Sequence, residues 1–459
     1  MMQEDVMTKT ERKAAVSLAT IYMLRMLGLF MILPVFALYA EHLEGSTPAL
    51  IGLAVGIYGL TQAILQMPFG MASDRIGRKP IIIIGLIIFA IGSVIAAMAD
   101  SMWGVIVGRA IQGAGAIAAT VMALAADLTR EEHRLKAMAI IGMSIGLSFS
   151  ASLILGPLFN EWIGVNGIFW LTALLALLGI VVVKYVVPTP AVSRFHRDAE
   201  PVPAQFKSIL SDHQLLRLDF GIFALHLMLT ATFVVLPLSL RDHAGLDPAN
   251  HWYVYLGVMV LAMGLMVPFV IRAEKKRKMK QVFIAAILML AVGEGALAIA
   301  YESLTGTIIA LIVFFIAFNV LEATLPSLIA KTAPPDKKGT AMGIYSSSQF
   351  FGAFCGGVTG GWLYGMGGIT AVFLFCVLVA LGWFLVAVTM KNPRYLGSYM
   401  LNVGEITEEE AKQLTMQLTR VDGVAEAVVI VEDGIAYLKV DSHALDREAL
   451  REFSVEQPS

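Results

Sequence analysis

The stretch Gly70-Met-Ala-Ser-Asp74-Arg75-Ile-Gly77-Arg78-Lys79-Pro80 lies between two strongly apolar segments and carries one carboxylate and three cations. A polar run this short between two bilayer-length segments predicts a tight charged turn at a membrane surface. Gly70 permits close helix approach, Gly77 permits unusual backbone dihedrals, and Pro80 is expected to open the next helix. The charged side chains can exchange partners between neighbouring helices when the protein changes shape.

The composition is that of a membrane protein. Of the 459 residues, 58% are hydrophobic and 15% are charged, and the mean hydropathy is +0.76. No soluble globular domain of this size shows that balance. The formal net charge of -2, with cations in short loops and no continuous basic face, argues against a nucleic-acid partner. Cys355 and Cys376 lie in apolar stretches without metal-ligand spacing, so we expect no disulfide, metal site or other cofactor, and no enzyme.

Windows of about twenty apolar residues predict an all-α polytopic fold with two sets of six membrane helices. They lie near 14–40, 49–72, 80–99, 102–127, 135–160, 166–187, 214–240, 251–272, 280–300, 304–330, 339–364 and 368–390. Arg25 interrupts the first segment, which is also too long for a cleaved signal peptide, so we expect a retained helix.

A proline-rich, basic stretch separates the two sets of helices and cannot cross a bilayer. The predicted domains are an N-terminal half over 1–187, a linker over 188–210, a C-terminal half over 211–392 and a small soluble domain over 398–459. Lys and Arg in short loops mark the cytoplasmic side. They cluster on one side of the helices, and the other side shows little beyond Arg241. Both termini and the linker are therefore expected in the cytoplasm of a bacterial cell, with the helices in its inner membrane.

The soluble domain has the pattern of a small α+β module. We expect strands at 399–403, 424–431 and 435–440, helices at 407–420 and 443–453, and a hairpin turn at 432–434. Asp441 or Ser442 is the expected cap of the last helix. The order βαββα resembles a ferredoxin-like domain without its last strand. An open sheet edge favours self-association, with ligand binding or gating as alternatives, and His443 is expected to be a surface residue.

Two six-helix halves with a charged turn after the second helix resemble the major facilitator superfamily of secondary transporters. Its motif G-x-x-x-D-R-x-G-R-K is matched at every fixed position by Gly70, Asp74, Arg75, Gly77, Arg78 and Lys79. A second family motif, R-x-x-Q-G-x-G-A, is matched on the fourth helix by Arg109, Gln112, Gly113, Gly115 and Ala116. With the appended domain, the chain resembles the drug/proton antiporter-like branch of that family. The antiporter motif G-x-x-x-G-P-x-x-G-G on the fifth helix is matched only at Gly156 and Pro157, which leaves the direction of transport open.

The resemblance implies that the charged turn is a conformational switch. In the family, this turn latches the two halves together on the cytoplasmic side. We expect Asp74 to face the positive end of the eleventh helix near Gly339 and Thr340, and Arg78 to reach Asp127. A solvated positive-inside anchor is the alternative.

Ionisable residues within membrane helices are expensive and are candidates for function. The candidates for proton coupling are Glu322, His226, Arg25 and Arg109. Glu322 is the first choice, because burial in the bilayer favours its neutral acid and transport can return it to the charged form. A lasting ion pair of Glu322 with Arg25 or Arg109 is the alternative, and His226 can instead bond to a neighbouring helix. Glu294 is expected to be peripheral.

Glycines at four-residue spacing predict close helix packing. They are Gly352, Gly356 and Gly360 with Gly357 and Gly361, Gly52 with Gly56, and Gly142 with Gly146. The leading hypothesis is a proton-driven exporter of small amphipathic compounds that works by alternating access. Symport or facilitated uptake is the second hypothesis, and a transporter-derived sensor that signals through the soluble domain is the third.

Overall fold

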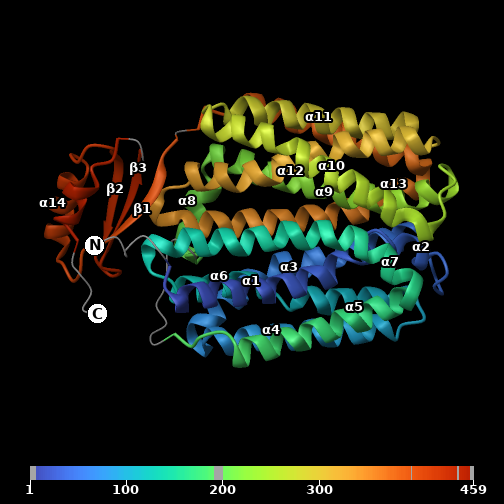
Figure 1. The fold of residues 1–459 in the computed structure, drawn as a ribbon, viewed down its shortest axis with the longest axis horizontal. Coiled ribbons are helices and arrows are strands. Elements are labelled where there is room, and N and C mark those ends of the chain that lie inside the picture. The colour runs from blue at the N-terminus through green and yellow to red at the C-terminus, as the bar shows by residue number, and fades with distance from the viewer. Residues whose placement is uncertain (1–6, 191–199, 394, 442–443, 455–459) are drawn as a thin grey trace.

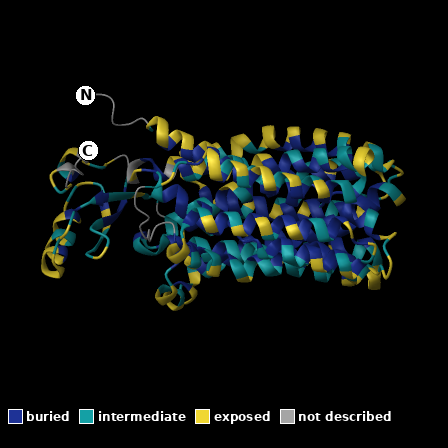
Figure 2. Ribbon diagram, turned by 90° about the horizontal axis from the view of Figure 1, so that it is seen from below, coloured by how far each residue is buried: buried dark blue, intermediate teal, exposed yellow. Residues whose placement is uncertain are grey.

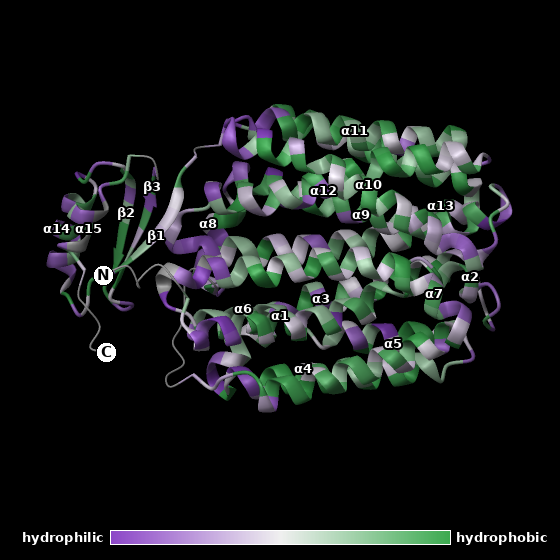
Figure 3. Ribbon diagram, viewed as in Figure 1, coloured by the Kyte–Doolittle hydropathy of each residue, from purple (hydrophilic) through white to green (hydrophobic). Residues whose placement is uncertain are grey.

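The computed structural model describes residues 7–190, 200–393, 395–441 and 444–454. Its helices form an elongated bundle, and a small domain that contains the β-sheet lies against one end of it (Figure 1). We call this end of the bundle the domain end and the opposite one the far end. Hydrophobic residues cover the length of the bundle, while hydrophilic residues gather at its two ends and on the small domain (Figure 3).

The described residues of the first half form seven helical elements. They are α1 (Lys9–Phe30), α2 (Phe36–Ala40), α3 (Pro48–Ile76), α4 (Arg78–Ala97), α5 (Met102–Ala114), α6 (Ala118–Asp127) and α7 (Glu131–Tyr185). The second half follows two short elements, η1 (Pro203–Gln205) and α8 (Phe206–Leu210). It contains α9 (His213–Asp242), η2 (Pro248–Asn250), α10 (His251–Lys275), α11 (Met279–Ala300), α12 (Leu304–Thr332), η3 (Pro335–Lys337) and α13 (Lys338–Val388).

Two of these helices are too long for a single crossing. α7 has 55 residues and α13 has 51, whereas about 20 helical residues span a bilayer core. Each contains one residue with non-helical dihedrals, Gly164 with φ 67° in α7 and Gly368 with φ 70° in α13. Glycine adopts this backbone conformation at little cost. Ten spans are long and apolar enough to cross a membrane, and division of these two gives the twelve expected segments in the described part of the chain.

The outside of the bundle is suited to lipid. Large apolar side chains such as Trp103, Val260, Leu378 and Leu385 are more than half exposed. Figure 2 shows such exposed positions along the outer helices and buried ones within. So large an exposed apolar surface is unfavourable in water, whereas the hydrocarbon core of a bilayer favours it.

Glycines of α13 bring the two halves into close contact. A Cβ atom on Gly356 would lie 2.1 Å from the backbone oxygen of Leu227 in α9, and one on Gly357 would lie 2.5 Å from that of Gly52 in α3. One glycine row therefore packs within the second half and the other packs against the first half. The packing prediction is confirmed for α13 and for Gly52 with Gly56. It is wrong for Gly142 and Gly146, where an added Cβ would have nothing within 4 Å among the described residues, because that face of α7 meets no neighbour.

The small domain has the expected order. It comprises β1 (Gly397–Asn402), α14 (Glu408–Leu418), β2 (Val424–Ile430), β3 (Ile435–Val440) and α15 (Arg447–Arg451). The strands form an antiparallel sheet in the order β1-β3-β2, which confirms the ferredoxin-like arrangement without a fourth strand in the described residues. The last helix is shorter than expected and is capped by Asp446, so the expected cap at Asp441 or Ser442 is wrong. Ser442 and His443 lie outside the described residues.

Candidate functional site

The charged corner at the domain end is tighter than a polar loop. α3 continues through Asp74 and Arg75 to Ile76, and α4 begins at Arg78. Gly77 alone makes the turn, with φ 106° and ψ 148°, a conformation that favours glycine. Gly70 lies against helix α6, where an added Cβ would be 3.1 Å from that of Ala119. The glycine roles expected from the sequence are present, but the charges stand on helix ends.

Arg78 is the centre of this corner and is only 3% exposed. Its Nη1 donates to Asp74 and, over 2.8 Å, to Ser73 Oγ. Its Nε donates to Asp127 Oδ2 at 3.2 Å, and its Nη2 donates to Glu200 Oε1 at 2.7 Å. The expected contact with Asp127 is confirmed. A guanidinium enclosed by three carboxylates is not a solvated anchor.

Glu200 was not among the residues expected in this site. It lies in the stretch between the two halves, is 3% exposed, and is the first described residue after 191–199. An acidic residue within a basic, proline-rich linker was the available signal. Its partner could not be read from sequence, because 122 positions separate it from Arg78.

The residues after Glu200 continue to the start of α13. The backbone N–H of Val202 donates to Thr340 Oγ1 at 2.9 Å, and this hydroxyl donates to Gln205 Oε1 at 2.8 Å. Both hydrogen bonds of the Thr340 hydroxyl are therefore made with residues 202–205. We call Glu200 together with residues 202–205 the linker strap. The contact expected between Asp74 and the start of this helix is not among the described interactions, and Asp74 bonds to Arg78 instead.

The remaining two cations of the corner differ in role. Lys79 Nζ donates to Val187 O at 2.7 Å and to Thr189 Oγ1 at 2.9 Å, so it binds the end of the first half. Arg75 is exposed. A basic side chain at the carbonyl end of a helix satisfies groups that the helix itself cannot bond.

The second family motif lies where the fourth membrane segment is interrupted. Helix α5 ends at Ala114 and α6 begins at Ala118, and in the break between them the carbonyl of Gly115 accepts a turn hydrogen bond from the N–H of Ile117 at 3.1 Å. Arg25 Nη2 donates to this oxygen at 3.0 Å, and also to Gln62 Oε1 at 2.6 Å and Tyr58 at 2.7 Å. Gly113 faces the backbone of Tyr58, whose oxygen would be 2.2 Å from an added Cβ. The motif therefore joins α1, α3 and α5.

Arg109 completes this polar region. It donates to the backbone oxygens of Ala54 and Val55 at 3.3 Å and to Gln112 Oε1 at 3.1 Å. Gln112 in turn donates to Ser93 Oγ at 2.8 Å. Neither Arg109 nor Arg25 contacts Glu322 in the described structure, which removes the lasting ion pair that was the alternative for that carboxylate.

The structure brings His226 and Glu322 together around Gln349 of α13. Gln349 Nε2 lies 2.8 Å from His226 Nε2 and donates to Glu322 Oε1 at 3.4 Å. His226 Nδ1 is 3.3 Å from Ile222 O, so the assigned tautomer donates from Nδ1 and accepts at Nε2. Protonation of His226 would turn Nε2 into a donor, and the Gln349 amide would have to rotate. Glu322 Oε2 is 4.0 Å from Nε2, which is within ion-pairing range of a protonated imidazole but beyond hydrogen-bond distance.

A second buried carboxylate lies two helical turns before His226 on α9. Asp219 is 5% exposed, and neither of its oxygens has a hydrogen-bond partner among the described residues. Tyr345 of α13 is within electrostatic range of both Asp219 and Glu322, and its hydroxyl is also without a described partner. Sequence reasoning missed Asp219 because it is close to the start of the segment, where a solvated charge is ordinary.

The other singled-out residues serve packing. Glu294 Oε1 accepts a 2.7 Å hydrogen bond from Thr232 of α9 and is fully buried, so it is interior rather than peripheral. A Cβ on Gly156 would lie 2.3 Å from Met31 O, and Pro157 continues the same helix. The partial antiporter motif thus allows α7 to approach the end of α1.

Comparison with known proteins agrees with this geometry. The model of the Major Facilitator Superfamily matches residues 18–280 and 220–398. The chain belongs to the major facilitator superfamily. It is 48% identical over 457 residues to the inner membrane transport protein YajR of Escherichia coli (strain K12), with 99% of each chain covered. The multidrug resistance protein MdtH of Proteus mirabilis (strain HI4320) is 24% identical over 75% of this chain and 85% of its own.

Solved structures share the superfamily fold. The human organic anion transporter MFSD10 has a TM-score of 0.63 at 18% identity, and the alignment covers 83% of this chain and all of that one. A bacterial homolog of the human lysosomal transporter Spinster has a TM-score of 0.67 at 15% identity, over 84% of this chain and 98% of its own. Membership confirms that the chain is a transporter with twelve membrane segments and not an enzyme.

The ferredoxin-like domain of this superfamily member contacts both halves. Lys439 of β3 is 2% exposed, and its Nζ donates to Ala330 O at 2.7 Å and Lys331 O at 3.3 Å, at the end of α12. Arg134 of α7 lies 3.6 Å from the sulfur of Met400 in β1. Burial, reinforced by the charge of Lys338, lowers the pKa of Lys439 to about 8.

Proposed function

We propose that this protein is a proton-coupled exporter of small amphipathic compounds in the bacterial inner membrane, with both termini and the ferredoxin-like domain in the cytoplasm. The observation that carries the proposal is the His226–Gln349–Glu322 cluster, in which three polar side chains from three helices meet inside the membrane. Proton carriers in transporters are typically Asp, Glu or His side chains within the membrane, and His226 and Glu322 are of this kind. The names of YajR and of the more distant MdtH support transport and export.

A change in access to the His226–Gln349–Glu322 cluster would couple proton binding to the movement of the two halves. The Glu322 side chain is 34% exposed, whereas that of His226 is 10% exposed, so part of the Glu322 side chain is accessible although its Oε2 is buried. The rings of Phe149 in the first half and Phe318 in the second half pack together, with 5.6 Å between their centroids. The centroid of the Phe318 ring lies 6.0 Å from that of the His226 imidazole. A movement of the halves that separates these rings would alter the surroundings of the proton site. Proton binding and alternating access are thereby linked.

Asp219 and Tyr345 extend the cluster toward the domain end. In this proposal, a proton leaves Glu322 toward the cytoplasm by way of Tyr345 and Asp219, whose side-chain oxygens have no hydrogen-bond partner among the described residues. Arg25 and Arg109 hold the first half together and set the local charge.

The charged corner acts as the conformational switch. Arg78 binds Glu200 and the strap binds Thr340, so the two halves are connected at the domain end when these contacts are made. At the far end, Arg241 of α9 lies 2.8 Å from Glu41, which follows α2. Both ends therefore carry charged contacts between the halves. Alternating access requires that each set is broken in turn.

Flux measurements test the function. Purified protein in proteoliposomes would be assayed with a panel of fluorescent amphipathic cations and anions under an imposed pH gradient of either sign. We expect export driven by protons moving inward, and loss of pH-driven flux with retained counterflow in Glu322→Gln. Glu302→Gln at the far end is the matched control, because Glu302 is exposed. Proton-driven accumulation in the opposite direction would establish symport. Flux that does not depend on the pH gradient would contradict proton coupling.

A further inference from the structure

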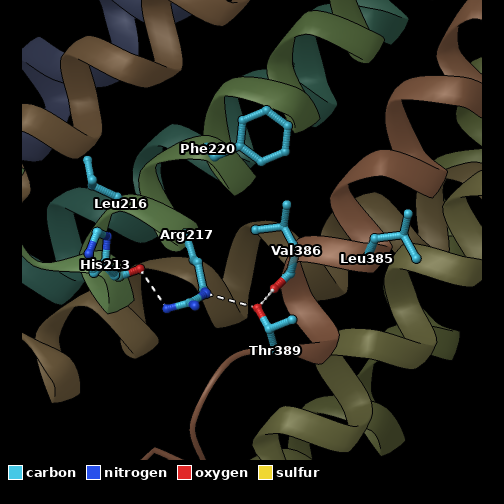
Figure 4. A pocket seen from close by; sticks show the side chains of 7 residues that line it. All are labelled: His213, Leu216, Arg217, Phe220, Leu385, Val386 and Thr389. Carbon is cyan, nitrogen blue, oxygen red and sulfur yellow. Dashed lines mark hydrogen bonds between the residues drawn. The ribbon is translucent and has the colours of Figure 1, made fainter.

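A groove opens on the outer surface of the second half, at the domain end. It encloses about 470 Å³ between the start of α9 and the end of α13. The residues that line it are His213, Leu216, Arg217, Phe220, Leu385, Val386 and Thr389. Figure 4 shows these side chains, which come from two helices on either side of the hollow. Neither transport nor the switch uses this groove.

Arg217 is held in place from two sides. Its Nε donates to Thr389 Oγ1 at 3.0 Å, and its Nη1 donates to the backbone oxygen of His213 at 3.0 Å (Figure 4). Nη2 has no partner among the described residues. The guanidinium is thus oriented by α9 and α13 together and retains donors for a further acceptor.

The acidic side chains nearest to Arg217 in the sequence do not pair with it in the described structure. The carboxylate of Asp212 is engaged by the backbone N–H groups of Gln214 and Leu215, as the cap of α9. Asp219 is buried in the bundle. Lys391, just beyond Thr389, is exposed and adds a second cation. No described carboxylate pairs with Arg217.

The rest of the groove is apolar and continues over the lipid-facing surface. Phe220 is 38% exposed and Leu385 is 68% exposed. Arg217 lies four residues into α9, about 6 Å from the start of the helix at 1.5 Å per residue. A cation at that depth is at the level of lipid headgroups, with apolar side chains deeper in the bilayer.

We propose that this groove binds an anionic phospholipid of the cytoplasmic leaflet. The lipid phosphate accepts hydrogen bonds from Arg217, and one acyl chain lies along Phe220 and Leu385. Basic pockets between membrane helices on the cytoplasmic side, where the proposed orientation places this groove, bind such headgroups, and arginine is suited to phosphate because of its planar set of donors. Free phosphate would leave the apolar part of the groove uncovered. A bound lipid would join the start of α9 to the end of α13, directly before the chain enters the ferredoxin-like domain.

Native mass spectrometry of the delipidated protein in detergent tests the site. The probes are phosphatidylglycerol, phosphatidylethanolamine and inorganic phosphate, each added to the full chain and to Arg217→Ala. We expect phosphatidylglycerol to bind in preference to phosphatidylethanolamine, and Arg217→Ala to weaken its binding about tenfold, as expected for one charge-assisted contact. Arg217→Lys should retain part of the affinity.

The matched control is Arg272→Ala, because Arg272 is an exposed arginine in the last turn of α10 at the same end of the bundle. Equal loss of phosphatidylglycerol binding in Arg217→Ala and Arg272→Ala would show that lipid binding depends only on general surface charge, and would overturn the proposal. Displacement of the lipid by millimolar inorganic phosphate would indicate an anion site and overturn the assignment to lipid. Thermal unfolding of each variant separates lost binding from lost folding, and Thr389→Val provides a second variant that disturbs Arg217 without removing its charge.

Discussion

Neutralisation of Glu200 is expected to shift the balance between the two access states of the transporter. Glu200 Oε1 accepts from Arg78 Nη2 at 2.7 Å, and both residues are 3% exposed. Glu200→Gln preserves the shape and removes the charge. If the contact is made only when the domain end is closed, the variant should favour the form that is open there.

The size of the effect follows from the partners that remain. A hydrogen bond between charged groups contributes about 1.5–3 kcal/mol, and a buried charge left without any partner costs about 3–5 kcal/mol. In the variant, Arg78 still pairs with Asp74 and Asp127, so its charge is not left without a partner. Removal of one of three carboxylates also relieves part of the repulsion among them, which offsets part of the loss. We therefore expect the lower value, about 1.5 kcal/mol, which is roughly a tenfold change in the population ratio.

Distances between spin labels at the domain end measure this ratio. Suitable exposed positions are Lys13 in the first half and Lys276 in the second, in a chain without its two cysteines. Glu161→Gln is the control, since Glu161 is exposed. In an Arg78→Gln background, Glu200→Gln should have no further opening effect. The reasoning would be refuted by an unchanged distance distribution, or by the same shift with and without Arg78.

Three further results are expected. Gly357→Ala should destabilise the contact between the halves by about 1–3 kcal/mol, because its Cβ would meet a backbone oxygen at 2.5 Å, whereas Gly382→Ala has open space within a helix and should not lower the melting temperature. Asp219→Asn should slow pH-driven flux while leaving counterflow intact, and equal loss of both would assign it a structural role. The pKa of Lys439 is lowered from 10.5 to about 8 in the docked domain, chiefly by burial. If undocking restores the ordinary pKa, the docked domain binds fewer protons, and docking should strengthen about tenfold from pH 7 to pH 9. Label distances between α14 and α11 would measure this, and a pH dependence that persists in Lys439→Met would contradict it.

Much of the architecture could be predicted because its causes are local. Apolar length alone indicates a membrane segment, and a cation-rich turn of the composition found at residues 74–79 has few places to lie except a membrane surface. The pairing of Arg78 with Asp127 was predictable only through the family resemblance, since 49 residues separate them. The βαββα order likewise followed from local strand and helix patterns. The last helix was expected to be longer than it is, and its cap was misplaced, at a point where several residues can serve.

The faces that helices present to one another could not be predicted in the same way. Gly142 with Gly146 has the same spacing as Gly52 with Gly56, yet only the second pair meets another helix. The spacing of small residues permits close approach, and the presence of a neighbour decides whether it occurs. Glu294 is expected at the periphery because the ninth membrane segment does not line the central cavity in this family, yet Glu294 is fully buried and accepts a hydrogen bond from Thr232.

Local signals in the sequence are enough to show that this chain spans a membrane in two six-helix halves, carries the charged motif of residues 70–79 and contains a ferredoxin-like domain. Hydrophobic length, charge and turn chemistry act over a few residues and can be read directly. Three contacts became visible only in the packed bundle: Glu200 with Arg78, His226 with Glu322 through Gln349, and Arg217 with a groove on the outer surface. Each of these contacts depends on the rotation of one helix against another, which is set by the packing of the whole bundle.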